Sequence, residues 1–265
     1  MNIDLTGRRA LVTGSTSGIG AAIAVGLARA GADVVVNGRS RERTAAAARS
    51  VGERSGAPQR VRPVAADVGT AEGCAALIDA APDIDILVNN AGVFTPQPVF
   101  EIPDEEWSRL FEVNVLSGIR LARHHVPAMV ERGWGRVIFI SSESAVQIPA
   151  EMVHYGTTKT AQLAVARGMA ESVSGTGVTI NSVLPGPTLT EGFRDFVAQE
   201  GIVGEEAVER AGREFIAAKR STSLLGRLIT PEEVANMVVF VASDQASATT
   251  GTALRVDGGV VRAIP

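Results

Sequence analysis

The sequence predicts an α/β fold organised around a doubly wound parallel sheet. Short runs of β-branched residues alternate with longer alanine-rich stretches along the 265 residues, as strands alternate with crossover helices in such sheets. The runs expected to form strands are continuously apolar, which is typical of strands covered by helices on both faces. Because α/β folds of this length often remain undivided, residues 1–265 are expected to form a single domain.

The expected elements follow one another in strict order for most of the chain. The expected strands are Ala10–Val12, Val34–Val36, Val61–Ala65, Ile84–Val88, Val137–Ile140, Val178–Val183 and Leu254–Val256. The expected helices between them are Ile19–Ala30, Arg41–Glu53, Thr70–Ala80, Pro103–Arg132 and His154–Val173.

Residues 188–225 interrupt this alternation with a long, polar segment that is expected to be helical. Three phenylalanines give the segment apolar surface to bury: Phe193, Phe196 and Phe215. Directly after it, Thr230-Pro231-Glu232-Glu233 indicates a helix start. Proline suits the first helical position, and a Thr followed three residues later by a Glu forms a capping box.

Composition argues against several classes of partner. The net charge is −4 and no basic block occurs, whereas nucleic-acid binding needs clustered Lys and Arg. No apolar run approaches the roughly 20 residues of a membrane helix, and no signal-peptide pattern is expected. Cys74 is the only cysteine, so no internal disulfide is possible and a reducing, cytoplasmic location is expected. The three histidines lack metal-ligand spacing, so no metal is expected.

A glycine-rich turn, Thr13-Gly14-Ser15-Thr16-Ser17-Gly18-Ile19-Gly20, joins the first expected strand to the first helix. Glycines let a backbone approach a ligand closely, and the free N–H groups at a helix start favour an anion such as a pyrophosphate. The spacing G-x-x-x-G-x-G differs from the general dinucleotide fingerprint and lacks the lysine of a P-loop. A tight turn with a purely structural role is the alternative, but the strand before it and the helix after it favour dinucleotide binding.

The residues after the second expected strand favour NADP(H) over NAD(H). In such folds an acidic residue about 20 residues beyond the glycine turn binds the ribose 2′-hydroxyl of NAD. Here the segment reads Val36-Asn37-Gly38-Arg39-Ser40-Arg41, without a carboxylate. Gly38 is expected to leave space, and Arg39 offers a planar cation suited to a 2′-phosphate. The alternative is that Arg39 and Arg41 are ordinary surface charges at the start of a helix.

Several further motifs occur in order along the chain. They are Asp67-Val68, Asn89-Asn90-Ala91-Gly92, the separated residues Asn114, Ser142, Tyr155 and Lys159, and Pro185-Gly186-Pro187-Thr188. Each motif alone is weak evidence. In this order and spacing, however, the motifs make the sequence resemble the short-chain dehydrogenase/reductase family over essentially the whole chain. The resemblance implies a Rossmann-like three-layer sandwich with a seven-stranded parallel sheet, in which residues 188–225 form a substrate lid.

The same resemblance implies the residues of the site. Asn114, Ser142, Tyr155 and Lys159 match the family's catalytic tetrad. The implied cofactor-binding residues are Gly14, Ser15, Thr16, Ser17, Gly18, Ile19, Gly20, Arg39, Asp67, Val68, Asn90, Ala91, Gly92, Tyr155, Lys159, Pro185, Gly186 and Thr188. The family commonly assembles as dimers or tetramers through its two long helices, so a homotetramer or homodimer is expected.

The residue types of the tetrad suit carbonyl reduction. Hydride transfer to a carbonyl generates an alkoxide that needs a proton, and a tyrosine can supply it, although its pKa of about 10 is high for the reverse role. Lys159 is four residues after Tyr155, so both side chains lie on one helical face. A nearby ammonium, together with an oxidised nicotinamide, favours the phenolate and is expected to lower the pKa of Tyr155.

Ser142 and Asn114 are expected to support this tyrosine. The hydroxyl of Ser142 is expected to stabilise charge on the substrate oxygen, while its neighbours Ser141 and Ser144 are rivals that fit turn positions. Asn114 lies in an expected helix, although Asn is a poor helix former. The family implies that Asn114 holds a water in a proton relay, and a polar surface residue is the alternative.

Other polar residues are candidates by residue type alone: Glu143, His124, His125 and His154. His124 and His125 lie in mid-helix without an identifiable partner, so an ordinary structural role is expected for both. His154 precedes Tyr155 and is expected beside the substrate.

The leading hypothesis is an oxidoreductase that transfers a hydride between NADP(H) and a small-molecule carbonyl or secondary alcohol, running as a ketone or 3-oxoacyl reductase. One alternative is a non-catalytic dinucleotide-binding regulator on the same fold, although such a binder has no need of both Tyr155 and Lys159. An NAD-dependent alcohol dehydrogenase is a second alternative. A dehydratase or epimerase of the related longer-chain branch is a third, disfavoured by the glycine spacing and by the lack of a large C-terminal domain.

Overall fold

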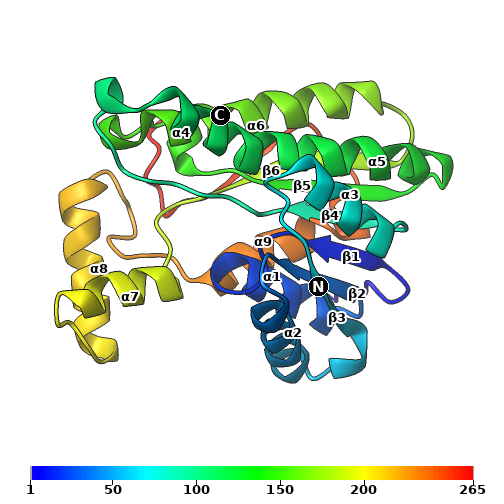
Figure 1. Cartoon of the computed structure of the whole chain (residues 1–265), viewed down its shortest axis with the longest axis horizontal. Helices are drawn as coiled ribbons and strands as arrows, with labels where there is room; N and C mark the ends of the chain where they lie inside the picture. The colour runs from blue at the N-terminus through cyan, green and yellow to red at the C-terminus, as the bar shows by residue number, and fades with distance from the viewer. Residues whose placement is uncertain (1, 265) are drawn as a thin grey trace.

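The computed structural model describes residues 2–264 and confirms the expected fold class, a three-layer α/β sandwich (Figure 1). Seven strands form one parallel sheet in the order β3-β2-β1-β4-β5-β6-β7. The strands are β1 Arg9–Val12, β2 Asp33–Gly38, β3 Val61–Ala65, β4 Ile86–Asn89, β5 Gly135–Ile140, β6 Val178–Pro185 and β7 Ala253–Val256. The strand order reverses between β1 and β4, and this reversal is where ligands bind in open α/β sheets.

The helices of the described chain occur where the sequence predicts them, with ends that differ by a few residues. They are α1 Gly18–Arg29, α2 Arg41–Ser55, α3 Ala71–Ala80, α4 Asp104–Phe111, α5 Ser117–Glu131, α6 Val153–Ser172, α7 Glu191–Gln199, α8 Glu205–Lys219 and α9 Pro231–Val241. The predicted capping box of α9 is confirmed, because Thr230 and Glu233 each bond the other's backbone N–H. Thr70 caps α3 through a 2.9 Å bond from the Gly73 N–H rather than beginning the helix.

Successive residues of each strand point to opposite faces of the sheet, so each strand contributes to two apolar cores. Val12 packs in the core beneath α1 and α9, together with Ile23 and Val238. Its neighbour Leu11 packs in the opposite core with Leu121 of α5. All five side chains are fully buried, and each such burial contributes about 1.5–3 kcal/mol to the stability of the fold. The continuous apolar runs of the strands therefore reflect burial on both faces.

The prediction of one uninterrupted α-helix over Pro103–Arg132 is wrong in its middle. Between α4 and α5, residues Glu112–Leu116 form a π-helical turn. Asn114 lies at the centre of this turn, and its carbonyl accepts a 2.5 Å hydrogen bond from Gln162 of α6. Single π-turns inside α-helices are frequent at functional sites, and this one turns the Asn114 side chain toward the end of β4.

The segment 188–225 forms two helices, α7 and α8, which stand to one side of the sandwich (Figure 1). Phe193 packs against Phe196 and Phe215, with ring centroids 6.5 and 5.8 Å apart. These contacts join α7 to α8, so much of the apolar surface of the segment packs against the segment itself. No helix among residues 2–264 is long and apolar enough to cross a membrane.

Candidate active site

The residues expected to form a site gather at the carboxyl ends of the strands. Thr13 follows β1, Asn90 follows β4, Ser142 lies two residues after β5, and Gly186 follows β6. These four strands are neighbours in the sheet, so their ends meet at one edge. The helix α6 crosses this edge and contributes the two remaining tetrad residues.

The glycine-rich turn is held in a conformation that glycine favours. Gly14 and Gly18 have φ of 60° and 53°, a region that other residues rarely adopt. An added Cβ at Gly20 would lie 2.5 Å from both the Asn90 amide nitrogen and the Gly14 carbonyl oxygen. The turn therefore needs glycine at Gly20 because neighbouring backbone and side chains approach too closely for any side chain.

Two residues that were expected to bind cofactor brace this turn from inside. Ser15 is fully buried, and its hydroxyl donates to the Val12 carbonyl at 2.7 Å. The Asn90 side chain donates to the carbonyls of Thr13 and Gly14 at 2.9 and 3.0 Å. These side chains shape the turn. The Ala91 N–H donates to the Thr13 hydroxyl at 3.0 Å and joins the same bracing.

The outward face of the turn binds a carboxylate from a distant part of the chain. The N–H of Gly18, at the start of α1, donates a 2.7 Å hydrogen bond to the carboxylate of Glu191. Thr16, Ser17 and Ile19 border the same face and are partly or fully exposed. A carboxylate at this position is what the partial positive charge of a helix N-terminus favours. Sequence analysis missed Glu191, which is 173 residues away along the chain.

Arg39 is exposed directly after β2, as expected for a residue that contacts a ribose phosphate. It takes part in none of the ion pairs found among residues 2–264. The expectation that Gly38 leaves open space is wrong. An added Cβ there would lie 2.4 Å from the Thr16 methyl and 2.8 Å from the Thr44 hydroxyl, so Gly38 permits close packing instead.

The remaining expected cofactor contacts lie around this edge. Asp67 is exposed and accepts the Gly69 N–H at 3.0 Å, whereas Val68 is buried. At the end of β6, Pro185 is followed by Gly186, where a Cβ would lie 2.7 Å from the Asp257 carbonyl oxygen. The Thr188 hydroxyl donates to the Gly186 carbonyl at 2.8 Å.

Tyr155 and Lys159 lie on one face of α6, as their spacing predicts. The Lys159 ammonium is 5.5 Å from the centre of the Tyr155 ring, and Phe94 packs edge-on against that ring at 5.8 Å. The Lys159 Nζ donates to the Ile140 carbonyl at 2.8 Å and to the Gln162 amide oxygen at 3.3 Å. Lys159 therefore connects the end of β5 to Gln162 on its own helix.

The electrostatics of this pair differ from the expectation that Lys159 lowers the pKa of Tyr155. Burial raises the pKa of Tyr155 above its ordinary value, and the nearby Glu143 carboxylate raises it further, while a hydrogen bond with Ser142 acts the other way. Burial lowers the pKa of Lys159 to about 7. A buried ammonium is itself disfavoured, so burial reduces the charge with which Lys159 can stabilise a phenolate near neutral pH.

Ser142 differs from its two neighbouring serines in what it contacts. Its hydroxyl donates to the Glu143 carboxylate at 2.6 Å and accepts the Ser144 N–H at 3.1 Å. Ser141 instead donates to the Lys159 carbonyl at 2.8 Å, which pins β5 to α6. Of the three serines, Ser142 is the one close enough to Tyr155 to lower the pKa of its hydroxyl.

Asn114 is buried and connects the loop after β4 to α6. Its amide nitrogen donates to the Val93 carbonyl and to the Thr158 hydroxyl, both at 3.0 Å, and its amide oxygen accepts the Val93 N–H at 2.8 Å. An added Cβ at Gly92 would lie 3.4 Å from the Lys159 Nζ and 3.5 Å from the Asn114 amide oxygen. The loop therefore brings Asn114 and Lys159 close to each other.

Gln162 is a site residue that sequence analysis missed. It is 1% exposed, accepts from Lys159 and donates to the Asn114 carbonyl at 2.5 Å. The Asn114 carbonyl therefore already accepts a hydrogen bond from a side chain of α6. The available signal was the position of a polar Gln three residues after Lys159, on the same helical face.

The histidines lie away from this constellation. His154 is fully buried and packs edge-on against Trp107 of α4, with 5.8 Å between ring centres. His125 is buried in α5, where burial lowers its pKa to about 4. His124 is exposed beside it. These contacts agree with an ordinary structural role for His124 and His125.

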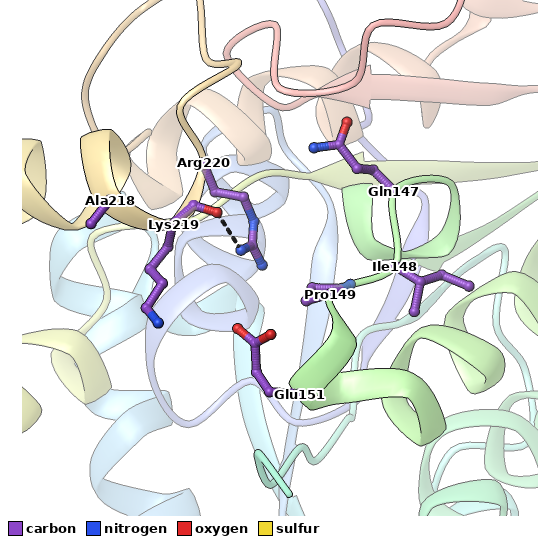
Figure 2. Close-up of a pocket in the computed structure, with 7 residues that line it drawn as sticks. All are labelled: Gln147, Ile148, Pro149, Glu151, Ala218, Lys219 and Arg220. Atoms are coloured by element: carbon purple, nitrogen blue, oxygen red, sulfur yellow. Dashed lines mark hydrogen bonds between the residues drawn. The ribbon is translucent and has the colours of Figure 1, made fainter. Parts of the chain in front are cut away.

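A pocket of about 240 Å³ opens between the loop that precedes α6 and the end of α8 (Figure 2). Its lining is mostly polar and comes from both segments: Gln147, Ile148, Pro149, Glu151, Ala218, Lys219 and Arg220. The loop 147–151 connects Ser142 to Tyr155, so this pocket adjoins the strand edge that carries the tetrad.

Comparisons with known proteins agree with this geometry. A family model described as enoyl-(acyl carrier protein) reductase matches residues 14–261. The chain is 48% identical over 264 residues to the uncharacterized oxidoreductase YvaG of Bacillus subtilis, with 100% of each chain covered. It is 31% identical to the 3-oxoacyl-[acyl-carrier-protein] reductase FabG of Aquifex aeolicus, covering 98% of this chain and 100% of that protein.

Among solved structures, the chain is similar to L-sorbose reductase from Gluconobacter frateurii complexed with NADPH and L-sorbose. The TM-score is 0.91 at 34% identity, and 100% of each chain is covered. Sequence, sheet order and these similarities agree along the whole length. The chain belongs to the short-chain dehydrogenase/reductase family of NAD(P)-dependent oxidoreductases.

Proposed function

We propose that this protein is an NADPH-dependent reductase of a ketone or 3-oxoacyl substrate, with Tyr155 as the general acid. One observation carries the proposal: Ser142 lies close enough to Tyr155, at the carboxyl edge of the sheet, to lower the pKa of its hydroxyl, and the Lys159 ammonium is 5.5 Å from the centre of the tyrosine ring. Two hydroxyls that converge in this way can both reach one substrate oxygen. The same side chains lie across that edge from the glycine-rich turn.

The turn and the end of β2 fit a phosphorylated dinucleotide. The Gly18 N–H at the start of α1 binds a carboxylate of the chain at 2.7 Å, which supports anion binding at this position. The exposed guanidinium of Arg39 is placed for a ribose 2′-phosphate. We propose that residues 14–20, Arg39, Asp67 and Thr188 hold NADP(H), in keeping with the NADPH complex of the related L-sorbose reductase.

The bound nicotinamide supplies the hydride for the carbonyl carbon. Tyr155 transfers its hydroxyl proton to the carbonyl oxygen, and burial keeps the tyrosine protonated before this step. Ser142 donates a hydrogen bond to the same oxygen and stabilises the charge that develops there. Lys159, held by the Ile140 carbonyl and Gln162, orients the helix face and offers a proton donor behind the tyrosine. Asn114 fixes the loop that approaches both residues.

The substrate class is proposed from the surroundings of Tyr155. Phe94, which packs on the Tyr155 ring, is 63% exposed and can contact an apolar part of a substrate. The adjoining pocket is polar and includes Lys219 and Arg220. We therefore propose that residues 188–225 act as a lid over a small ketone that carries polar groups. A homotetramer or homodimer in the cytoplasm completes the proposal, and light scattering tests the assembly.

Turnover assays test the function. NADPH oxidation is to be measured with L-sorbose, acetoacetate and a 3-oxoacyl thioester. At least one ketone is expected to be reduced, and Tyr155→Phe is expected to lower kcat by about 100-fold or more while leaving the NADPH dissociation constant unchanged. Turnover of Tyr155→Phe at the wild-type rate would contradict the assignment of the general acid. NADPH binding without turnover of any ketone would favour the non-catalytic alternative.

A further inference from the structure

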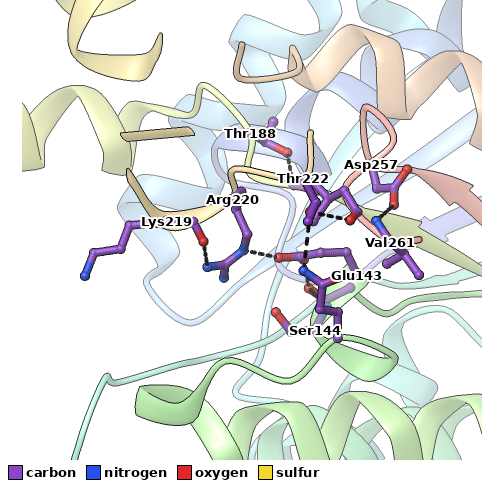
Figure 3. Close-up of polar contacts among 12 residues, drawn as sticks. Glu143, Ser144, Thr188, Lys219, Arg220, Thr222, Asp257 and Val261 are labelled. Carbon is purple, nitrogen blue, oxygen red and sulfur yellow. Dashed lines mark hydrogen bonds and ion pairs between the residues drawn. The ribbon is translucent and has the colours of Figure 1, made fainter. Parts of the chain in front are cut away.

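A buried ion pair lies directly behind Ser142. The Glu143 carboxylate accepts the Ser142 hydroxyl through Oε2 at 2.6 Å and the Arg220 Nε through Oε1 at 2.9 Å (Figure 3). The exposed fractions of the two charged side chains are 5% for Glu143 and 11% for Arg220. A charge that is removed from water to this extent is costly unless it is paired. The presence of the Ser142 hydroxyl does not by itself require Glu143 or Arg220.

The two members of the pair come from different parts of the molecule. Glu143 begins the short 3₁₀ turn after β5, whereas Arg220 is the residue that ends α8. The Arg220 guanidinium also donates to the Lys219 carbonyl at 2.8 Å, which holds it against the helix end. Two residues further on, the Thr222 hydroxyl donates to the Val260 carbonyl. The contact thus joins the α7–α8 segment to the serine through one carboxylate.

The hydroxyl of Ser142 carries a single proton. In this structure the proton is donated to Glu143, whereas carbonyl reduction requires it to be donated to the substrate oxygen. A carboxylate with no cation beside it would hold the proton more strongly than one that is shared with a guanidinium. The pairing with Arg220 therefore weakens Glu143 as a competitor and sets the direction of the hydroxyl.

We propose that Glu143 and Arg220 are positioning residues that act through Ser142, so that the seating of α8 controls the orientation of the serine hydroxyl and the charge beside Tyr155. The inference rests on the proposed reductase function and extends it. It assigns a role to the end of the α7–α8 segment: when Arg220 is in place, the negative charge of Glu143 is partly neutralised and the carboxylate holds the serine proton less strongly.

The charged and titratable groups around this centre are few. Tyr155 and Lys159 face it from α6, and Arg220 faces it from α8. From the C-terminal segment, Asp257 is engaged by the N–H groups of Gly259 and Val261 at 3.0 and 2.9 Å. The effect of Glu143 on Tyr155 is unfavourable for the phenolate, so the pair also bears on the pH at which the general acid is lost.

The pH dependence of kcat for ketone reduction by NADPH tests the proposal. Glu143→Gln removes a negative charge near Tyr155, so the alkaline limb of the profile is expected to move to lower pH by about one unit. Arg220→Met leaves the Glu143 carboxylate without its cation. The limb is then expected to move to higher pH, and kcat is expected to fall about tenfold because Ser142 is held by Glu143.

Further variants separate this role from a structural one. Arg220→Lys keeps a cation and is expected to recover most of the kcat that Arg220→Met loses. The double variant Glu143→Gln/Arg220→Met removes both charges and is expected to be more active than Arg220→Met alone. Arg194→Met is the matched control, since it breaks the exposed 2.8 Å ion pair with Glu205 in the same segment and is expected to leave the pH profile unchanged.

Specific outcomes overturn the proposal. Profiles of Glu143→Gln and of the double variant that superimpose on the wild-type profile would show that the pair only fastens α8. A rise in KM with unchanged kcat and pH profile in Arg220→Lys would assign Arg220 to substrate binding instead. Either result would leave the proposed reductase function intact, because that function is tested separately by Tyr155→Phe.

Discussion

The carboxylate of Glu191 and the N–H of Gly18 are 2.7 Å apart, so the first residue of α7 is bonded to the first residue of α1. This position at the start of α1 is where the proposed cofactor would place its pyrophosphate. The carboxylate and the pyrophosphate are both anions and compete for the same N–H. Cofactor binding and the position of α7 are therefore coupled.

Glu191→Gln is expected to tighten NADPH binding. The variant keeps the size of the side chain and removes the competing charge, and interactions of this kind at a helix start are worth about 1 kcal/mol. The NADPH dissociation constant, measured by fluorescence titration, is expected to fall roughly fivefold. Glu200→Gln, an exposed position at the other end of α7, serves as the control and is expected to bind like the wild type. Weaker binding by Glu191→Gln would show that Glu191 supports the cofactor site instead of competing for it.

Arg39→Ala is expected to remove most of the preference for NADPH over NADH. Arg39 is exposed after β2, and a charge-assisted hydrogen bond to a phosphate contributes about 1.5–3 kcal/mol. The ratio of the two dissociation constants should thus fall by roughly tenfold or more. Arg41→Ala provides the comparison, because Arg41 begins α2 two residues later and is equally exposed. An unchanged ratio in Arg39→Ala would identify Arg39 as a surface charge.

Gln162→Met is expected to lower kcat by about tenfold, with NADPH binding close to that of the wild type. Methionine has a similar length but cannot accept from Lys159 or donate to the Asn114 carbonyl, so both lose a buried partner. Steady-state kinetics and calorimetric binding measure the two effects. Thr160→Val on the same helix removes a hydroxyl that bonds the Ala145 and Gly156 carbonyls, and little change in kcat is expected. A wild-type kcat in Gln162→Met would show that Gln162 only fills space.

His125→Leu is expected to make the fold less sensitive to acid. Burial lowers the pKa of His125 to about 4, from an ordinary value of 6.5. Between these values the unfolded chain binds the proton and the folded chain does not, so stability falls as the pH falls from 6.5 toward 4. The loss amounts to about 3 kcal/mol at the acid end. Removal of the imidazole abolishes this contribution.

Urea unfolding at pH 7 and at pH 4.5 measures this effect. The difference in unfolding free energy between the two pH values is expected to be smaller for His125→Leu than for the wild type. His124→Leu changes the exposed neighbour in the same turn and is expected to retain the wild-type difference. Equal acid sensitivity in all three proteins would rule out His125 as a source of acid lability.

The sequence allowed the strands and helices to be predicted because they depend on local spacing, whereas the tetrad was predicted from the resemblance of its ordered motifs to a family. Continuous apolar runs such as Val34–Val36 indicate strands that are buried on both faces, and the structure confirms them. The capping box of Thr230 and Glu233 involves residues three apart, so its geometry follows once the helix forms. Tyr155 and Lys159 share a face of α6 for the same reason.

Contacts between distant segments were not predictable from such spacing. The π-turn at Asn114 depends on bonds to Val93 and Gln162, which belong to other elements. The pKa of Tyr155 depends on burial and on Glu143 rather than on the spacing to Lys159 alone. Buried environments of this kind arise only when the sheet and its helices have packed.

By itself, the sequence determined the fold class, the order of the strands and helices along the chain, and the identity of the residues that can do carbonyl chemistry. Only the tertiary structure decided how those residues are held: Glu143 meets Arg220 across 77 residues, and Gly18 meets Glu191 across 173. The physical reason is that periodicity and capping act within one or two turns of chain. Charge pairing and hydrogen bonding between segments depend on which strand ends the topology brings to the same edge of the sheet.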